Sequence, residues 1–122
     1  LQGAVESVGN KHGRPIDADI VMDGRFLPNP HWEDAVRPLT GHDPAVRDFV
    51  LERAQASDFL DRFGELMRVL LPSYEAEGKS YLTVAFGCTG GRHRSVAVAE
   101  ELARRLREQG YAVHTGHRDI NR

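Results

Sequence analysis

Cysteine is scarce in this sequence, and its scarcity excludes two kinds of protein. Among 122 residues there is one cysteine, Cys88. A single thiol cannot close an intramolecular disulfide, which excludes a small secreted scaffold stabilised by disulfides. It also cannot supply the two or more thiolates of a cysteine-rich zinc site. These absences favour a reducing compartment, so we expect a cytoplasmic protein.

Long hydrophobic runs are also lacking. No apolar run approaches 18 residues, so the sequence predicts no transmembrane helix and no membrane partner. Residues 1–3 have no signal-peptide pattern and do not begin with Met, which indicates a part of a longer protein. What is present, 40% hydrophobic and 28% charged residues, is typical of one compact globular domain.

Neither positive nor negative charge dominates, but the two are unevenly distributed along the chain. Residues 1–91 contain 9 basic and 14 acidic residues, whereas residues 92–122 contain 7 and 4, within a net charge of −2. A basic C-terminal third could contact anions such as nucleic acid or phosphate. The alternative interpretation is a solvated helix face that carries Arg104, Arg105 and Arg107.

Hydrophobic periodicity predicts four strands and three helices. The expected strands cover residues 4–8, 20–22, 81–86 and 111–115. The expected helices are a short one capped by Asp43 and Pro44, a longer one from Ser57 with Pro72 at or shortly before its end, and a third over 95–108 with Gly110 as its C-cap.

These elements predict an α/β fold, with a small, mainly parallel sheet of about four strands, helices packed on it, and a C-terminal βαβ unit. In a parallel sheet, the segments that follow the strands lie at one edge, where open α/β sheets bind ligands. Those segments are 9–14, 23–32, 87–94 and 116–119.

The segment 87–95, Gly-Cys-Thr-Gly-Gly-Arg-His-Arg-Ser, contains the strongest functional pattern. Gly90 and Gly91 permit a tight turn and a close approach of the backbone to a ligand. The following helix begins near Ser95, whose hydroxyl, with that of Thr89, adds a donor, and Arg94 and Arg92 add positive charge. This combination predicts a phosphate site at a helix N-terminus. The alternative is a glycine-rich turn before a solvated basic helix.

The spacing Cys88-x5-Arg94 also matches the signature of cysteine-dependent phosphatases, in which a thiolate attacks phosphorus. Those enzymes have His before the cysteine, and this sequence has Gly87 there. We therefore expect Cys88 to be a small residue that fits the loop and contacts the ligand, with no catalytic residue in the domain.

Two other patterns are not supported as sites. Residues 78–80, Gly-Lys-Ser, resemble the end of an ATP-binding P-loop, but Ser73 replaces the required glycine and the strand comes after the motif. The spacing His114-x2-His117 has no paired carboxylate pattern beside it, so we expect no metal site and no cofactor.

The segment 23–32 carries a second group of polar residues between stiff prolines. A carboxylate such as Asp23 would repel a phosphate but would suit a hydroxyl or an ammonium on the same ligand. A sugar phosphate or amino sugar phosphate would satisfy both Asp23 and Arg94. The alternative is that Asp23 caps the turn and that His31 packs under Trp32.

The segments 23–32, 37–41 and 87–96 together resemble the C-terminal domain of the RapZ/YvcJ family of bacterial RNase adapter and nucleotide-binding proteins. The resemblance covers essentially the whole chain. It implies that residues 1–122 are a single ligand-binding domain, the C-terminal fragment of a protein with an N-terminal ATPase domain. It also implies homo-oligomerisation through this domain.

The resemblance further implies a sugar-phosphate-sensing regulatory adapter that binds glucosamine 6-phosphate. Some members bind small RNA and present it to an endoribonuclease, and others are associated with the nucleotide sugar UDP-GlcNAc. The family's ligand contacts fall at Asp23, His31, Cys88, Thr89, Gly90, His93 and Arg94.

We therefore predict a non-catalytic domain that binds an amino sugar phosphate. The net charge of −2 makes the RNA-binding role a weaker expectation, and a nucleotide-sugar module or a phosphatase that uses Cys88 and Arg94 are the alternatives. From the residues and the resemblance together, the expected binding residues are Asp23, His31, Cys88, Thr89, Gly90, Gly91, His93, Arg94 and Ser95.

Overall fold

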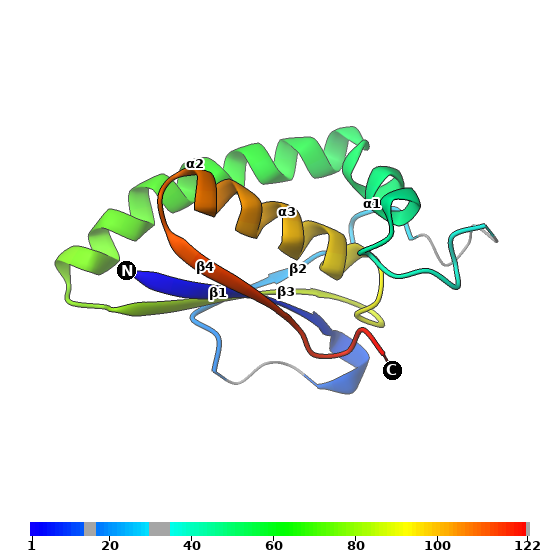
Figure 1. Ribbon diagram of the computed structural model, residues 1–122, viewed down its shortest axis with the longest axis horizontal. Coiled ribbons are helices and arrows are strands. Elements are labelled where there is room, and N and C mark those ends of the chain that lie inside the picture. Colours follow the sequence, from blue (N-terminus) through cyan, green and yellow to red (C-terminus); the bar gives the residue numbers. More distant parts are fainter. Residues whose placement is uncertain (14–16, 30–34, 122) are drawn as a thin grey trace.

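The computed structural model describes residues 1–13, 17–29 and 35–121. Its centre is a four-stranded sheet with the order β2-β3-β1-β4. The strands are β1 (Gln2–Gly9), β2 (Ile20–Asp23), β3 (Tyr81–Cys88) and β4 (Ala112–His117). Every neighbouring pair is parallel. The predicted α/β fold with a mainly parallel sheet is confirmed (Figure 1).

The register of the strands aligns their C-terminal ends. Gly9 at the end of β1 is opposite Cys88 at the end of β3, and Asp23 at the end of β2 is opposite Gly87. A short 3-10 helix, η1 (Asn10–His12), follows β1 directly. The segments that follow the strands therefore share one edge of the sheet, as the parallel arrangement predicted.

Three helices lie on one face of the sheet: α1 (Pro44–Leu51), α2 (Ala54–Ala76) and α3 (Arg94–Glu108) (Figure 1). The core lies between that face and the helices. Its largest fully buried side chains include Phe86 of β3, Leu60 and Met67 of α2, and Leu102 of α3. Strand β3 and helix α3 lead to β4, which confirms the expected βαβ unit.

Helix α1 begins as predicted. The Asp43 carboxylate accepts a hydrogen bond of 2.9 Å from the Ala45 backbone N–H, and Pro44 occupies the first helical position. Proline suits that position because its missing N–H has no intrahelical partner there in any case.

Helix α2 differs from its prediction at its start. It begins at Ala54 rather than Ser57, after Arg53, which makes no side-chain cap. It continues past Pro72 and ends at Ala76, which agrees with the expectation that Pro72 lies at or shortly before its end. Proline costs one intrahelical hydrogen bond, but Leu71 beside it is buried in the core. Tertiary packing therefore outweighs the local cost.

Helix α3 begins one residue earlier than predicted, at Arg94, and its C-cap is Gln109 rather than Gly110. Gly110 follows with a φ of 96°, the left-handed conformation that favours glycine after a helix. Strand β4 also extends to His117, beyond the predicted end at residue 115. Within the described part of the chain, no helix is long and apolar enough to cross a membrane.

We expect truncation of a fully buried α2 side chain to destabilise the domain strongly. Leu60 is 1% exposed, so Leu60→Ala should lower the free energy of unfolding by about 2–5 kcal/mol through lost burial and a residual cavity. Val69 is on the same helix but 66% exposed, and Val69→Ala should change it by less than about 0.5 kcal/mol. Urea denaturation of both variants provides the measurement, and equal losses would contradict this placement of the core.

Candidate functional site

A cavity of about 730 Å³ opens at the C-terminal edge of the sheet. Most of its wall is the segment between β3 and α3, and the rest comes from η1 and from the segments before α1. The lining residues are Lys11, Asn29, Arg37, Pro38, Cys88, Thr89, Gly90, Gly91, Arg92, His93 and Arg94. Four of them are Lys or Arg, and no lining residue among those described is a carboxylate. The wall is therefore electropositive.

The loop after β3 packs against the end of β1. A Cβ on Gly9 would lie 2.4 Å from the carbonyl carbon of Gly90, so only glycine permits this approach. Gly91 has a φ of 84°, which is strained for other residues. The Lys11 N–H also donates to the Thr89 carbonyl oxygen at 3.2 Å. The loop is thus held against β1 and η1 by its backbone.

Cys88 and Ser95 face each other beneath this loop. The Cys88 thiol donates to the Ser95 Oγ at 3.1 Å and accepts from the Gly91 N–H at 3.3 Å. Cys88 is 3% exposed and Ser95 is fully buried. These contacts join the two ends of the loop, and Ser95 supports the wall through Cys88 instead of lining the cavity.

Arg94 is buried and ties two segments of the site together. Its Nη1 donates to the carbonyl oxygens of Arg25 at 3.0 Å and Leu27 at 3.1 Å, and its Nη2 donates to the Thr89 Oγ1 at 3.4 Å. The guanidinium that the sequence suggested for phosphate binding therefore also holds the segment after β2 against the loop.

Arg92 provides a different kind of donor. Its Nη2 donates to the Pro38 carbonyl oxygen at 3.2 Å. Its Nε is buried and has no hydrogen-bond partner among the described residues. A buried donor without a partner is costly, so this atom favours an acceptor that is supplied by a ligand.

The segment 37–41 is fastened to the same loop. His93 Nε2 lies 3.0 Å from the Arg37 carbonyl oxygen, and the Gly41 N–H donates to the Arg92 carbonyl oxygen at 2.7 Å. These contacts hold Arg37 and Pro38 in the cavity wall.

Asp23 lies beside the cavity rather than in its lining. Its carboxylate accepts from the Arg25 Nε at 2.9 Å and from the Arg25 N–H at 3.0 Å. The side-chain and backbone hydrogen bonds of Arg25, with the positive charges of Arg25 and Arg94, lower the pKa of the Asp23 carboxyl to about 2. These contacts agree with the alternative given from the sequence, in which Asp23 caps the turn after β2.

The structure thus brings six of the nine predicted residues into one cavity wall: Cys88, Thr89, Gly90, Gly91, His93 and Arg94. Ser95 is behind the wall, Asp23 is beside it, and His31 lies outside the described residues. Sequence reasoning did not single out Lys11, Arg37 or Pro38 as site residues. Lys11 was within the predicted edge segment 9–14, and Arg37 and Pro38 were within the motif 37–41.

Comparison with known proteins matches residues 1–121 to the RapZ C-terminal domain. The chain is 55% identical over 122 residues to a nucleotide-binding protein of Thermobifida fusca and 56% identical over 122 residues to one of Frankia casuarinae. It is 56% identical over 119 residues, 97% of the chain, to a nucleotide-binding protein of Mycobacterium tuberculosis. The chain is matched in full by the first two relatives but spans only 42% of their length, and 40% of the third.

Two adjacent glycines should respond differently to substitution. A Cβ on Gly91 would lie 2.6 Å from the Gly9 nitrogen at a φ of 84°, whereas a Cβ on Gly90 would meet nothing closer than Lys11 at 4.0 Å. Gly91→Ala should therefore lower the free energy of unfolding by at least about 1–2 kcal/mol. Gly90→Ala should lower it by less than about 0.5 kcal/mol. Urea denaturation compares them, and similar losses would contradict the packing of this loop on β1.

Proposed function

This chain belongs to the RapZ C-terminal domain family, and we propose that it is a regulatory domain that binds an amino sugar phosphate such as glucosamine 6-phosphate, with no catalytic role. The family and its relatives' names support a binding domain. The sugar phosphate is our assignment, and the observation that carries it is the cationic cavity wall, in which none of the lining residues that the structure describes is a carboxylate.

The phosphate end of the ligand fits the wall formed by the loop after β3. Lys11, Arg37 and Arg92 bring positive charge to it, and the buried Nε of Arg92 requires an acceptor. Helix α3 begins at Arg94 beside the same cavity, and the first N–H groups of a helix favour an anion. Charge, the unpartnered donor and the helix end therefore all favour a phosphate at this wall.

The residues of the wall would have different roles: some would contact the ligand, and others would support the loop. Thr89 is exposed and would offer its hydroxyl to a phosphate oxygen, while Gly90 and Gly91 let the backbone come close. Cys88 and Ser95 support the loop from below, and Arg94 and His93 hold the neighbouring segments in place. In this assignment Arg94 contributes charge to the ligand while its Nη1 remains bound to protein carbonyl groups.

The sugar end of the ligand would be directed toward Asp23. An ammonium group would replace Arg25 as a partner of the carboxylate, which remains ionised at neutral pH because its pKa is about 2. His31 remains a proposed contact from the sequence and the family resemblance. A carboxylate next to a cationic wall suits a ligand that carries both a phosphate and an amine.

A nucleotide sugar such as UDP-GlcNAc is the second candidate. The relatives are named nucleotide-binding proteins, and a cavity of about 730 Å³ lies within the range of about 300–1,000 Å³ for small-molecule sites. A nucleotide sugar would place its diphosphate at the same wall.

RNA binding through α3 is less favoured than either small ligand. Arg104 forms ion pairs with Glu101 and Glu108, and Arg105 forms ion pairs with Glu101 and Asp61. A phosphodiester backbone would have to break these pairs to use that face. An N-terminal ATPase domain, an endoribonuclease and a second copy of the chain remain proposed partners from the family resemblance.

Loss of the Arg92 guanidinium should weaken binding of glucosamine 6-phosphate. We expect Arg92→Ala to reduce the affinity by about 10- to 100-fold, the loss of a charged hydrogen bond of roughly 1.5–3 kcal/mol. Arg62→Ala is the control, because Arg62 is a 77% exposed side chain of α2 paired with Asp58. Isothermal titration calorimetry measures both. Absence of heat with wild-type protein would refute the sugar-phosphate assignment, and tighter binding of UDP-GlcNAc would favour the second candidate.

The carboxylate of Asp23 should distinguish the amino sugar from its hydroxyl analogue. Asp23→Asn removes the negative charge, so the affinity for glucosamine 6-phosphate should fall by about tenfold through loss of a charge-assisted hydrogen bond, and that for glucose 6-phosphate should change by less than about threefold. Asp58→Asn is the matched control, since Asp58 is also an exposed carboxylate paired with an arginine. Equal losses for the two sugars would show that Asp23 does not face the amine.

A further inference from the structure

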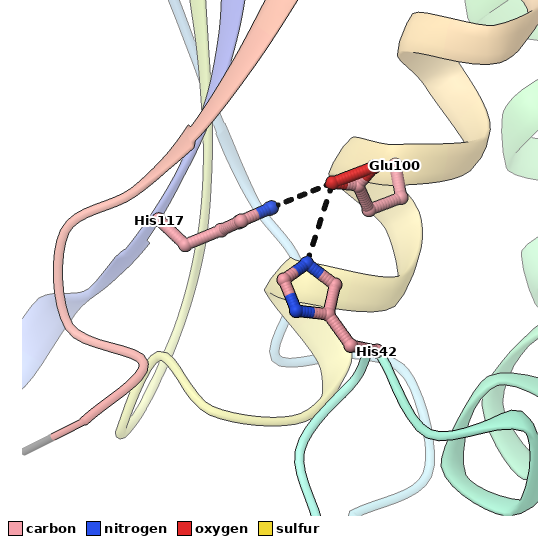
Figure 2. A group of neighbouring side chains, drawn as sticks. All are labelled: His42, Glu100 and His117. Atoms are coloured by element: carbon pink, nitrogen blue, oxygen red, sulfur yellow. Dashed lines mark hydrogen bonds and ion pairs between the residues drawn. The ribbon is translucent and has the colours of Figure 1, made fainter.

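Three side chains that no sequence motif connects meet beside helix α3. They are His42 in the turn before α1, Glu100 on α3 and His117 at the end of β4 (Figure 2). The Glu100 Oε1 lies 2.8 Å from the His117 Nε2 and 3.4 Å from the His42 Nε2. One potential ligand atom from each residue lies within 4.8 Å of the other two.

The donor set is one that binds transition metals. Two imidazoles and one carboxylate are among the ligand sets used by zinc, which keeps a fourth position open for water. In a tetrahedral site with bonds of about 2.0–2.2 Å, neighbouring ligand atoms are roughly 3.3–3.5 Å apart. Two of the three separations, 2.8 and 3.4 Å, lie close to that spacing, and the third pair of ligand atoms lies within 4.8 Å.

The deepest ligand already has the support that a metal-bound histidine requires. His117 Nδ1 lies 2.6 Å from the Ser7 Oγ, Ser7 is fully buried, and the His117 side chain is 9% exposed. A hydrogen bond at Nδ1 fixes the ring and directs the Nε2 lone pair to a metal.

The third ligand, His42, leaves the site accessible to an ion from solvent. The His42 side chain is 52% exposed and comes from a turn rather than a helix or strand. Its ring meets that of His117 edge to face, with centroids 4.8 Å apart. A small rotation of His42 would therefore bring its nitrogen to the metal while the two better-buried ligands stay in place.

We propose that His42, Glu100 and His117 bind one divalent transition-metal ion of the zinc class, with Ser7 orienting His117. In the metal-bound form the two Nε2 atoms are unprotonated ligands, and the Nδ1–H of His117 donates to Ser7. The ion replaces the hydrogen bonds that Glu100 now makes with the two rings.

Such an ion would join three elements of the fold. His42 lies on the segment that supplies Arg37 and Pro38 to the cavity wall, Glu100 lies on the helix that begins at this cavity, and His117 ends the edge strand β4. Metal binding would hold that wall against α3 and β4. The site is separate from the proposed sugar-phosphate site and does not depend on its ligand.

His114 provides a matched control because it is on the same strand but outside the cluster. Its Nε2 lies 3.0 Å from the Tyr81 hydroxyl, and residues three apart on a strand point to opposite faces. The spacing His114-x2-His117 therefore does not form the site.

Metal binding is tested with untagged, chelator-treated protein titrated with Co²⁺, whose visible absorption reports the coordination, and then with Zn²⁺ in competition. We expect one ion per chain, an intense tetrahedral Co²⁺ spectrum, and a rise in melting temperature with Zn²⁺. His42→Ala and Glu100→Gln should each weaken binding by at least about 10- to 100-fold, because loss of a supporting residue alone has this effect. Ser7→Ala should weaken it by about tenfold.

The control and the folding check make the outcome decisive. His114→Ala should bind Co²⁺ within about twofold of wild type, and His42→Ala should keep the metal-free melting temperature because its side chain is half exposed. Absence of a Co²⁺ spectrum with wild-type protein, or a spectrum that persists in both His42→Ala and Glu100→Gln, would overturn the proposal.

Discussion

Parallel pairing of all four strands is the constraint on which the rest of the structure depends. Strand β1 lies between β3 and β4, and the last residues of β1 and β3, Gly9 and Cys88, lie opposite each other. Parallel strands need long crossovers, and those from β2 to β3 and from β3 to β4 contain α1, α2 and α3 on one face of the sheet (Figure 1). The same arrangement brings the segments after β1, β2 and β3 to a single edge, where the cationic cavity opens.

The cavity wall is held together by side chains of the loop after β3, two of which, Arg92 and Arg94, also give it positive charge. Arg94 binds the carbonyl groups of Arg25 and Leu27, His93 contacts that of Arg37, and Arg92 binds that of Pro38. Loop backbone cannot satisfy its own carbonyl groups as a helix does, so these side chains supply the missing donors. Positive charge and loop geometry therefore arise from the same residues.

Helix α3 connects the two sites that we propose. Its first turn borders the cavity, and Glu100 in its second turn belongs to the histidine cluster (Figure 2). The segment 37–42 reaches from one to the other, because Arg37 and Pro38 line the cavity and His42 contacts Glu100. Events at either site would thus act on the same short segment.

Local sequence was sufficient for much of the fold. Alternation and apolar runs predicted all four strands. The glycines and arginines of segment 87–95 indicated an anion site between a strand and a helix. These predictions depend on neighbours in the chain, whose spacing determines which side chains share a face.

Other features were decided only by the tertiary structure, because they depend on residues that are far apart in the sequence. The start of α2 at Ala54 instead of Ser57 follows from packing in the core, which outweighs local propensity. The partners of Arg94 and the position of Asp23 depend on how segment 24–27 folds back. His42, Glu100 and His117 are up to 75 positions apart in the sequence, and no periodicity relates them. They meet because the crossover helix α3 lies on the sheet between the turn before α1 and the end of β4.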